Sequence, residues 1–353
     1  MSMMAKATSY QEKLGWDGQW EKVFKPFSAD GLIPARVISE YKATYLVSGE
    51  DHDYKARLMG KFRYESGGRE GYPIVGDWVA IKPLPDIKEA IIQTVLPRRS
   101  KISRKVPLGE SREQILAANV DKIFIVMALD QSFSLRSLER FLVVAKGFGL
   151  EAVVILNKMD LCDNVTQRLS EAKACVGEHP VLAVCSFTQN GYGNLRKHLQ
   201  KGRTIVLIGP SGVGKSTIVN NFMGEEVQDV MDVRAADSKG RHMTSSRELF
   251  LLPQGALILD SPGLRELQLW ETGQGVEEVF GEIDVLKSQC RFQDCTHQHE
   301  PGCAVHLALT RGELSQERYD SFIKLQKELA FLAARKEEKS WRERKNKNRK
   351  NLK

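Results

Sequence analysis

The sequence lacks a hydrophobic run long enough to cross a membrane. Its longest uncharged apolar stretch extends from Ile123 to Leu129, whereas a membrane-spanning helix needs about 20 consecutive apolar residues. The opening residues MSMMAKATSYQEKLGWDGQW also lack the apolar core of a signal peptide. We therefore expect a cytoplasmic protein with no membrane partner.

Cysteine is scarce, with six residues in a chain of 353. This excludes a disulfide framework of the kind found in small secreted domains. Cys162, Cys175 and Cys185 are scattered among apolar residues, and core packing is the preferred interpretation for them. The other three are clustered near residue 300 and point to a metal site.

The chain also lacks internal repeats and extremes of composition. Hydrophobic residues make up 42% and charged residues 27% of the sequence, which excludes a wholly disordered or collagen-like chain. A length of 353 residues exceeds what one hydrophobic core usually serves. Two or three domains are therefore expected.

Excess charge is absent from most of the chain. Lysine and arginine number 52 against 45 acidic residues, a surplus of 7. Residues 335–353 contain ten basic and three acidic residues, which equals the whole surplus. This tail predicts salt-sensitive, sequence-independent contact with RNA phosphates, with Trp341 able to stack on a base. A solvated, disordered end is the alternative.

The first third of the chain predicts a small barrel. Residues 1–30 show no sustained period and are expected to form an irregular lead-in. Five short strand-like segments then follow within residues 31–106, and Tyr54, Ala56 and Leu58 show the alternation of a half-buried strand. A five-stranded OB-type barrel is predicted, although an SH3-like barrel fits almost as well. The basic segment PRRSKISRK at its end indicates a charged linker or the rim of a binding face.

Residues 107–281 predict a mostly parallel α/β sheet. Buried apolar strands alternate with helical segments, and Ser134 is a candidate cap for the helix that follows it. Such sheets bind ligands in the loops that leave the carboxyl ends of their strands. The strand segments are VDKIFIVMAL, EAVVILN, VLAVCSF, RTIVLIG and ALILD.

A phosphate-binding loop follows one of these strands and precedes a helix. Its glycines allow backbone N–H groups to turn towards phosphate oxygens, Lys215 supplies positive charge at the β and γ phosphates, and Ser216 can bind Mg²⁺ through its hydroxyl. The loop consists of Gly209, Pro210, Ser211, Gly212, Val213, Gly214, Lys215, Ser216 and Thr217.

The tetrapeptide NKMD predicts a preference for guanine over adenine. The two carboxylate oxygens of Asp160 match the N1–H and exocyclic amine of guanine, a donor pair that adenine lacks. The Lys158 stem can lie along the base, and Asn157 can connect this loop to the phosphate-binding loop. Ser186 falls where the backbone of a short loop would meet the guanine oxygen. A surface turn is the alternative for NKMD taken alone.

A third predicted nucleotide-binding motif, DSPG, lies at the end of the last apolar strand. Asp260 would hold Mg²⁺ through water, and the Gly263 amide would sense the γ-phosphate. Thr244 is the candidate switch hydroxyl on Mg²⁺. Leu264 replaces the side chain that orients water in many GTPases, so His242 is the candidate catalytic residue beside Lys215.

The order of these motifs differs from that of ordinary GTPases, which begin with the phosphate-binding loop and end with the base-reading motifs. Here the base-reading motifs come first. Joining the old termini and opening another connection leaves the active loops in place. The sequence therefore predicts a circularly permuted GTPase domain.

Residues 282–334 predict a zinc-binding, mainly helical domain. Cys290, Cys295, His297 and Cys303 follow a C-x4-C-x-H-x5-C pattern, which suits one closed, tetrahedral structural zinc site. His299 is an alternative to His297, and a reduced cysteine cluster without metal is the alternative to zinc. Ser315 is a candidate cap for a final helix with an apolar stripe.

This set of motifs resembles the bacterial ribosome small-subunit-dependent GTPases over about residues 30–335. Family members usually carry two consecutive threonines after the switch histidine, where this chain has Met243 and Thr244. The segments that carry the resemblance are YPIVGDWVAI, VLPRRS, NKMD, GPSGVGKST, GRHMTSS, DSPGLREL and CRFQDCTHQHEPGC.

The resemblance implies an OB-fold domain, a permuted GTPase and a zinc domain that together bind the 30S ribosomal subunit, with its 16S rRNA, during late maturation. It also implies GTP hydrolysis to GDP that the subunit stimulates, and we expect a monomer. A GTP-binding RNA scaffold without useful turnover is the alternative. A metabolic P-loop kinase is disfavoured because NKMD would then have no role.

Overall fold

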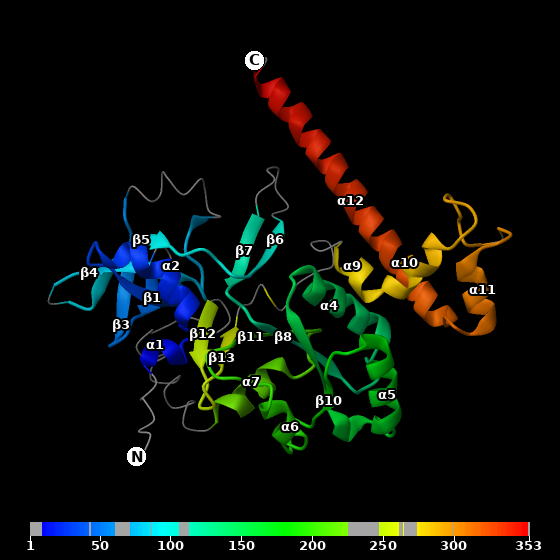
Figure 1. The fold of residues 1–353 in the computed structure, drawn as a ribbon, viewed down its shortest axis with the longest axis horizontal. Coiled ribbons are helices and arrows are strands. Elements are labelled where there is room, and N and C mark those ends of the chain that lie inside the picture. Colours follow the sequence, from blue (N-terminus) through cyan, green and yellow to red (C-terminus); the bar gives the residue numbers. More distant parts are fainter. Residues whose placement is uncertain are drawn as a thin grey trace. The chain divides into compact units, whose positions relative to one another are not determined.

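The protein forms two compact units in the computed structural model (Figure 1). Within the described residues, the first unit holds all the strands together with helices α1, α2 and α5 to α7, and the second holds helix α4 and helices α9 to α12. The structure describes residues 9–41, 44–60, 71–85, 87–105, 113–224, 247–260, 264, 274–298 and 300–351.

Two helices precede the barrel, so the irregular lead-in expected from the sequence is wrong for residues 10–28. Helix α1 spans Tyr10–Lys13 and helix α2 spans Gly18–Ser28. Ser9 and Glu12 form a capping box at the start of α1, and Asp17 accepts hydrogen bonds from two backbone N–H groups of α2. Trp20 and Phe24, one turn apart in α2, are both buried.

Five strands close into the predicted OB-type barrel. Their order is β1-β2-β3-β5-β4, and β4 returns to pair with β1. All neighbours are antiparallel except β3 and β5, which are parallel. Side chains such as Val37, Val47 and Ile81 fill the interior with no exposed surface. The strands are β1 (Ile33–Tyr41), β2 (Thr44–Ser48), β3 (Asp53–Leu58), β4 (Trp78–Pro83) and β5 (Glu89–Val95).

The basic segment after the barrel is a structural element and not a linker. Arg98 forms a bidentate ion pair with the fully buried Asp77. Arg99 stacks on Trp20, 4.1 Å from the ring centroid, and donates two hydrogen bonds to Asp17. For both arginines the interpretation as a charged linker is therefore wrong, whereas the rim of a binding face stays a prediction. The chain continues into a two-stranded sheet of β6 (Lys101–Lys105) and β7 (Glu113–Ala118).

A parallel sheet follows, as the alternation of strands and helices predicts. Its order is β10-β9-β8-β11-β13. An additional strand, β12, runs antiparallel to β13 and also pairs with β1, so barrel and parallel sheet form one continuous sheet. No strand is expected at β12 from the sequence pattern. The strands are β8 (Lys122–Ala128), β9 (Glu151–Asn157), β10 (Val181–Ala183), β11 (Thr204–Ile208), β12 (Arg247–Leu251) and β13 (Leu257–Asp260).

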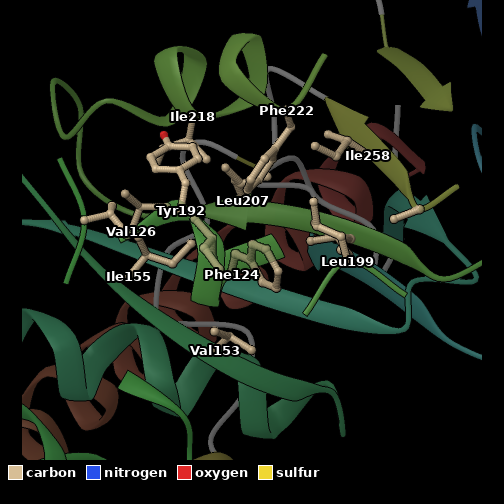
Figure 2. Close-up of a cluster of buried hydrophobic side chains, with 14 of the residues drawn as sticks. Phe124, Val126, Val153, Ile155, Tyr192, Leu199, Leu207, Ile218, Phe222 and Ile258 are labelled. Atoms are coloured by element: carbon tan, nitrogen blue, oxygen red, sulfur yellow. The ribbon is translucent and has the colours of Figure 1, made fainter. Parts of the chain in front are cut away.

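One face of this sheet carries a large apolar core cluster. Phe124 of β8 and Leu207 of β11 lie on the same side as Ile218 and Phe222 of the helix above them (Figure 2). Alternate residues of each strand contribute, which is the period of a pleated strand. The core thus fixes the strand ends from which the functional loops emerge. The helices of this unit are α5 (Val165–Val176), α6 (Tyr192–Arg196) and α7 (Lys215–Met223), with a short helix η2 (Met159–Leu161).

The second unit is helical, and two of its helices begin at the predicted caps. Ser134 accepts a hydrogen bond from Ser137 N, and Ser315 accepts one from Arg318 N. Helix α12 continues through the basic segment, which is therefore helical. None of the helices within the described residues is long and apolar enough to span a membrane. The helices are α4 (Leu135–Gly147), α9 (Gln274–Val279), α10 (Gly281–Ser288), α11 (Ala304–Arg311) and α12 (Gln316–Asn351).

A buried ion pair joins helices of the second unit. Arg318 of α12 contacts the carboxylate of Glu139 in α4 at 2.7 Å, and both side chains are at most one fifth exposed. Arg318 also pairs with Glu282 at 2.8 Å and donates to Val279 O at 2.6 Å. Ser321 donates a second hydrogen bond to Glu139. A single guanidinium therefore connects α4, α10, α12 and the end of α9.

Candidate nucleotide site and metal centre

The predicted nucleotide motifs meet at one edge of the parallel sheet. Strand β9 ends at Asn157, β11 ends directly before Gly209, and β13 ends at Asp260. Ser186 follows the short strand β10. Because these strands are parallel, their carboxyl ends lie at the same edge, where such sheets bind ligands.

Two glycines of the phosphate-binding loop admit no side chain. Gly209 has φ of 142°, and a Cβ atom there would lie 2.1 Å from Val126 O. Gly214 has φ of 95°, and a Cβ atom there would lie 2.3 Å from the Asn157 amide nitrogen. Glycine tolerates positive φ, and its lack of a side chain lets the loop pack this closely against β8 and β9.

Lys215 begins helix α7 and reaches back across the loop. Its Nζ donates to Gly209 O at 2.8 Å and to Pro210 O at 2.6 Å. Positive charge and the helix N-terminus are thus placed together, which is the arrangement that binds phosphate. Ser216 and Thr217 follow in the first turn with exposed side chains, as does Ser211 within the loop.

Asn157 connects three loops of the site. Its Nδ2 donates to Val213 O in the phosphate-binding loop at 2.8 Å. Its Oδ1 accepts from Ser186 N at 3.1 Å and from the Ser186 hydroxyl at 2.8 Å. Since Asn157 is only 1% exposed, these hydrogen bonds hold the base-reading loops and the phosphate-binding loop in a fixed relation.

Tyr192 and Asn221 extend this network and were missed by the sequence analysis. The Asn221 amide donates to Ser186 O at 2.7 Å and to the Tyr192 hydroxyl at 3.0 Å. The Tyr192 hydroxyl lies 3.0 Å from the Ser186 hydroxyl, and burial raises the pKa of Tyr192. Neither residue belongs to a nucleotide motif, so only their positions on α6 and α7 reveal them.

The side chains that are predicted to read the base lie at the surface beside this network. Asp160 is exposed in helix η2, and Lys158 before it has φ of 59°. The Lys158 ammonium pairs with Asp130 at 2.9 Å. The Ser132 hydroxyl and Lys158 hold the pKa of Asp130 well below its usual value, at about 2. Asp130, in the loop after β8, is a second residue that no motif indicated.

Asp260 is partly buried at the end of β13. Strand β13 pairs in parallel with β11, so Asp260 and the phosphate-binding loop leave the sheet at the same edge. Leu264 is 2% exposed. The predicted residues His242, Thr244 and Gly263 lie outside the described residues.

Four predicted metal ligands come together in the second unit. The ligand atoms of Cys290, Cys295, His297 and Cys303 all lie within 4.8 Å of one another. His297 Nδ1 is 3.5 Å from the sulfur of Cys290 and 3.5 Å from that of Cys303, and these two sulfurs are 4.0 Å apart. Ligands of a tetrahedral zinc ion lie roughly 3.5 to 3.8 Å apart, given bonds of about 2.0 to 2.3 Å. The donor set therefore fits zinc.

The loop that presents His297 is held by Glu300. The Glu300 carboxylate accepts from Thr296 N at 2.8 Å and from Gln298 N at 3.0 Å. His297 itself has a backbone φ of 62°, a conformation that residues other than glycine rarely adopt. Burial lowers the pKa of His297, which favours the neutral imidazole that binds a metal. His299 lies outside the described residues.

The chain matches known sequences and structures over most of its length. A sequence model of the family described as RsgA GTPase matches residues 95–270. The small ribosomal subunit biogenesis GTPase RsgA of Opitutus terrae is 40% identical over 331 residues, which are 91% of this chain and 90% of that protein. The small ribosomal subunit biogenesis GTPase RsgA 1 of Oceanobacillus iheyensis is 36% identical over 95% of this chain and 94% of its own.

Two solved structures have the same fold. YjeQ from Thermotoga maritima aligns with a TM-score of 0.63 and 26% identity, over 85% of this chain and 99% of that one. YloQ, described as a circularly permuted GTPase, aligns with a TM-score of 0.59 and 27% identity, over 85% of this chain and 95% of that one. The predicted permutation and the predicted family are thus confirmed. With relatives at 36 to 40% identity over nine tenths of their length, the chain belongs to the RsgA GTPase family.

Proposed function

We propose that the protein is a GTPase of small ribosomal subunit biogenesis that binds the 30S subunit, hydrolyses GTP when the subunit stimulates it, and then dissociates. The observation that carries this proposal is the Asn157 network, which joins the guanine-reading loops to the phosphate-binding loop. Relatives of matching length are named small ribosomal subunit biogenesis GTPases. The proposed function places the protein in the cytoplasm, where the subunit matures.

The proposed guanine contacts divide between side chain and backbone. Asp160 accepts from the N1–H and exocyclic amine of the base, and the backbone at Ser186 donates to the guanine oxygen. The Lys158 stem lies along the base while its ammonium stays paired with Asp130. Asn157 holds these groups in place and does not itself read the base.

The proposed phosphate contacts come from the loop of residues 209–217. Its backbone N–H groups and the Lys215 ammonium neutralise the β and γ phosphates. Mg²⁺, when bound, supplies further charge neutralisation at these phosphates, and Ser216, Thr244 and Asp260 are the residues proposed to hold it. Gly263 senses the γ-phosphate, and His242 is proposed to orient the attacking water.

Docking on the subunit is assigned to the parts outside the GTPase domain. We propose that the barrel of residues 31–106 and the zinc domain of residues 282–334 contact the 30S subunit and its 16S rRNA, and that residues 107–281 form the GTPase domain. GTP favours docking, and hydrolysis weakens it, because a nucleotide shifts an equilibrium only through its different affinity for two states. The protein acts as a monomer in this proposal.

The basic tail adds nonspecific affinity for RNA phosphates. Its ten basic residues lie mostly in the C-terminal part of α12. Each contact between a basic side chain and an RNA phosphate releases counterions. Deleting residues 336–353 is expected to lower 30S affinity and the slope of its salt dependence, with GDP affinity unchanged. Binding measured by pelleting with subunits at several salt concentrations checks this. If the slope of the salt dependence is unchanged, the tail does not contact the subunit.

A single-turnover GTP assay with and without 30S subunits tests the main proposal. We expect slow intrinsic hydrolysis that rises in the presence of subunits. The Lys215→Ala variant, with its phosphate charge removed, is the control and is expected to lose nucleotide binding or turnover. Hydrolysis that is the same with and without subunits would favour the GTP-binding RNA scaffold instead.

A further inference from the structure

Strand β12 links the barrel directly to the strand that ends at the magnesium residue. On one side β12 pairs with β1 of the barrel, with Ser39 opposite Glu248. On the other side it pairs with β13, with Glu248 opposite Asp260. Ser39, Glu248 and Asp260 therefore form one row across three strands, and the barrel is roughly 10 Å from the predicted magnesium residue, at about 4.8 Å per strand.

Side chains reinforce the pairing of β1 with β12. The Ser39 hydroxyl donates to Arg247 O at 3.3 Å, and Ser39 is buried. Arg247 Nη1 lies 3.3 Å from the Glu40 carboxylate, with side-chain exposures of 21% and 37%. The two residues also face each other in the strand register. An opposite-charge cross-strand pair of this kind favours one register over its alternatives.

Strand β1 is also attached near its beginning to the strand that leads to the phosphate-binding loop. The fully buried Arg36 of β1 donates to the Thr204 hydroxyl, at the start of β11, at 2.7 Å. It also donates to Leu14 O and to Gly76 O. Burial lowers the pKa of Arg36 to about 10. These buried bonds hold one end of β1 against the sheet.

We propose that β1 and β12 carry the effect of subunit docking from the barrel to Asp260, with Glu40 and Arg247 as positioning residues. The inference rests on the proposed function, because it assumes that the barrel contacts the subunit. Arg247 opens β12 and directly follows residues 225–246, the part of the sequence that holds the predicted His242 and Thr244. The one strand thus connects the barrel with both predicted switch positions along the chain and with Asp260 across the sheet.

Charge reversal of the pair tests this route. We expect Glu40→Arg and Arg247→Glu each to lower 30S-stimulated turnover about fivefold or more, because two like charges would face each other across β1 and β12. The double variant, which exchanges the two charges, restores the pair and is expected to regain most of the stimulation. Intrinsic turnover without subunits, GDP affinity and 30S binding are expected to match those of the unmodified protein.

Glu171→Arg and Arg168→Glu are the matched controls. Their ion pair, at 3.0 Å, lies within helix α5 and has exposures of 29% and 48%, and it is not part of the row from Ser39 to Asp260. These variants are expected to be stimulated normally. Equal losses in the α5 variants would show a general effect of charge and would overturn the proposal.

The remaining outcomes separate this inference from the proposed function. Normal stimulation of the Glu40 and Arg247 single variants would overturn the inference alone, and so would losses that the double variant does not restore. Reduced 30S binding by Glu40→Arg would place the residue in the docking surface and would also overturn the route. If subunits fail to stimulate GTP hydrolysis by the unmodified protein, this result contradicts the proposed function and, with it, the inference.

Discussion

The two units reach their structures by different physical means. In the first, long apolar strands stack alternate side chains into a continuous core under α7, with Phe124, Leu207 and Ile218 at or below 8% exposure. In the second, helices bury apolar side chains such as Leu142, Phe280 and Phe322, and a Cys/His cluster and the Glu139–Arg318 pair supply further specific contacts. A core of hydrocarbon tolerates the loss of one polar contact, whereas a metal centre or a buried ion pair does not.

This difference has a functional meaning. The predicted nucleotide loops need fixed strand ends, and a sheet with a closely packed apolar core provides them. The second unit is proposed to present a surface to an RNA-protein particle, for which a local metal centre can hold a small domain. The following variants are expected to affect one unit and spare the other.

Removal of the metal is expected to have the largest effect. Chelation, or Cys303→Ser, should unfold the cysteine-rich part of the second unit, because structural zinc contributes on the order of 10 kcal/mol to the folding of small zinc domains. Metal analysis and hydrogen exchange of residues 280–325 measure this, and GDP affinity should stay unchanged. Cys185→Ser, at a buried cysteine of the first unit, is the control and should keep its zinc. Unchanged exchange in zinc-free protein would contradict the expectation.

Arg318→Ala is expected to have the next largest effect. It leaves the Glu139 carboxylate, 5% exposed, without its cation, and breaking a buried pair from one side costs about 3 to 5 kcal/mol. Denaturant unfolding followed in the second unit measures the loss. Arg311→Ala is the matched control, because its pair with Glu313 is exposed at 60% and 61% and should contribute less than about 1 kcal/mol. Equal losses in the two variants would show that the buried network has no special role.

Asp160→Asn is expected to have the smallest effect on folding. Its effect is confined to nucleotide binding. The exposed side chain contributes little to stability, but the variant loses the acceptor for the guanine amine. We expect a loss of roughly 1.5 to 3 kcal/mol in GDP affinity and a relative gain for xanthine nucleotides, whose oxygen at that position can accept from the new amide. Binding titrations measure both. Asp163→Asn, at a neighbouring exposed aspartate, should leave both affinities unchanged. If Asp160→Asn keeps the preference of the unmodified protein for guanine over xanthine, Asp160 does not read the base.

The sequence predicted those features whose physical cause is local. The P-loop glycines, the caps at Ser134 and Ser315, and the barrel strands each follow from the chemistry of neighbouring residues, and the structure has them. The helices of residues 10–28 were missed although their caps, Ser9 and Asp17, are visible in the sequence. Pro26 lies inside α2, and an internal proline argues against a helix when only the sequence is considered.

Contacts between distant segments were beyond the reach of sequence patterns. Arg98 and Arg99 look like surface charges until Asp77 and Asp17 are placed beside them. Asp130, Tyr192 and Asn221 belong to no motif, and only the packing of β8, α6 and α7 brings them to the nucleotide loops. The pairing of β12 with β1 joins residues about 200 positions apart.

By itself, the sequence determined the predicted nucleotide motifs and the Cys/His cluster, because short loops and ligand spacings are encoded by adjacent residues. The tertiary structure decided which of these groups are held rigid, which charges are paired, and which strand connects the barrel to Asp260. The physical reason is that hydrogen bonds and ion pairs across a sheet depend on register and burial, and these are set only when the whole core has packed.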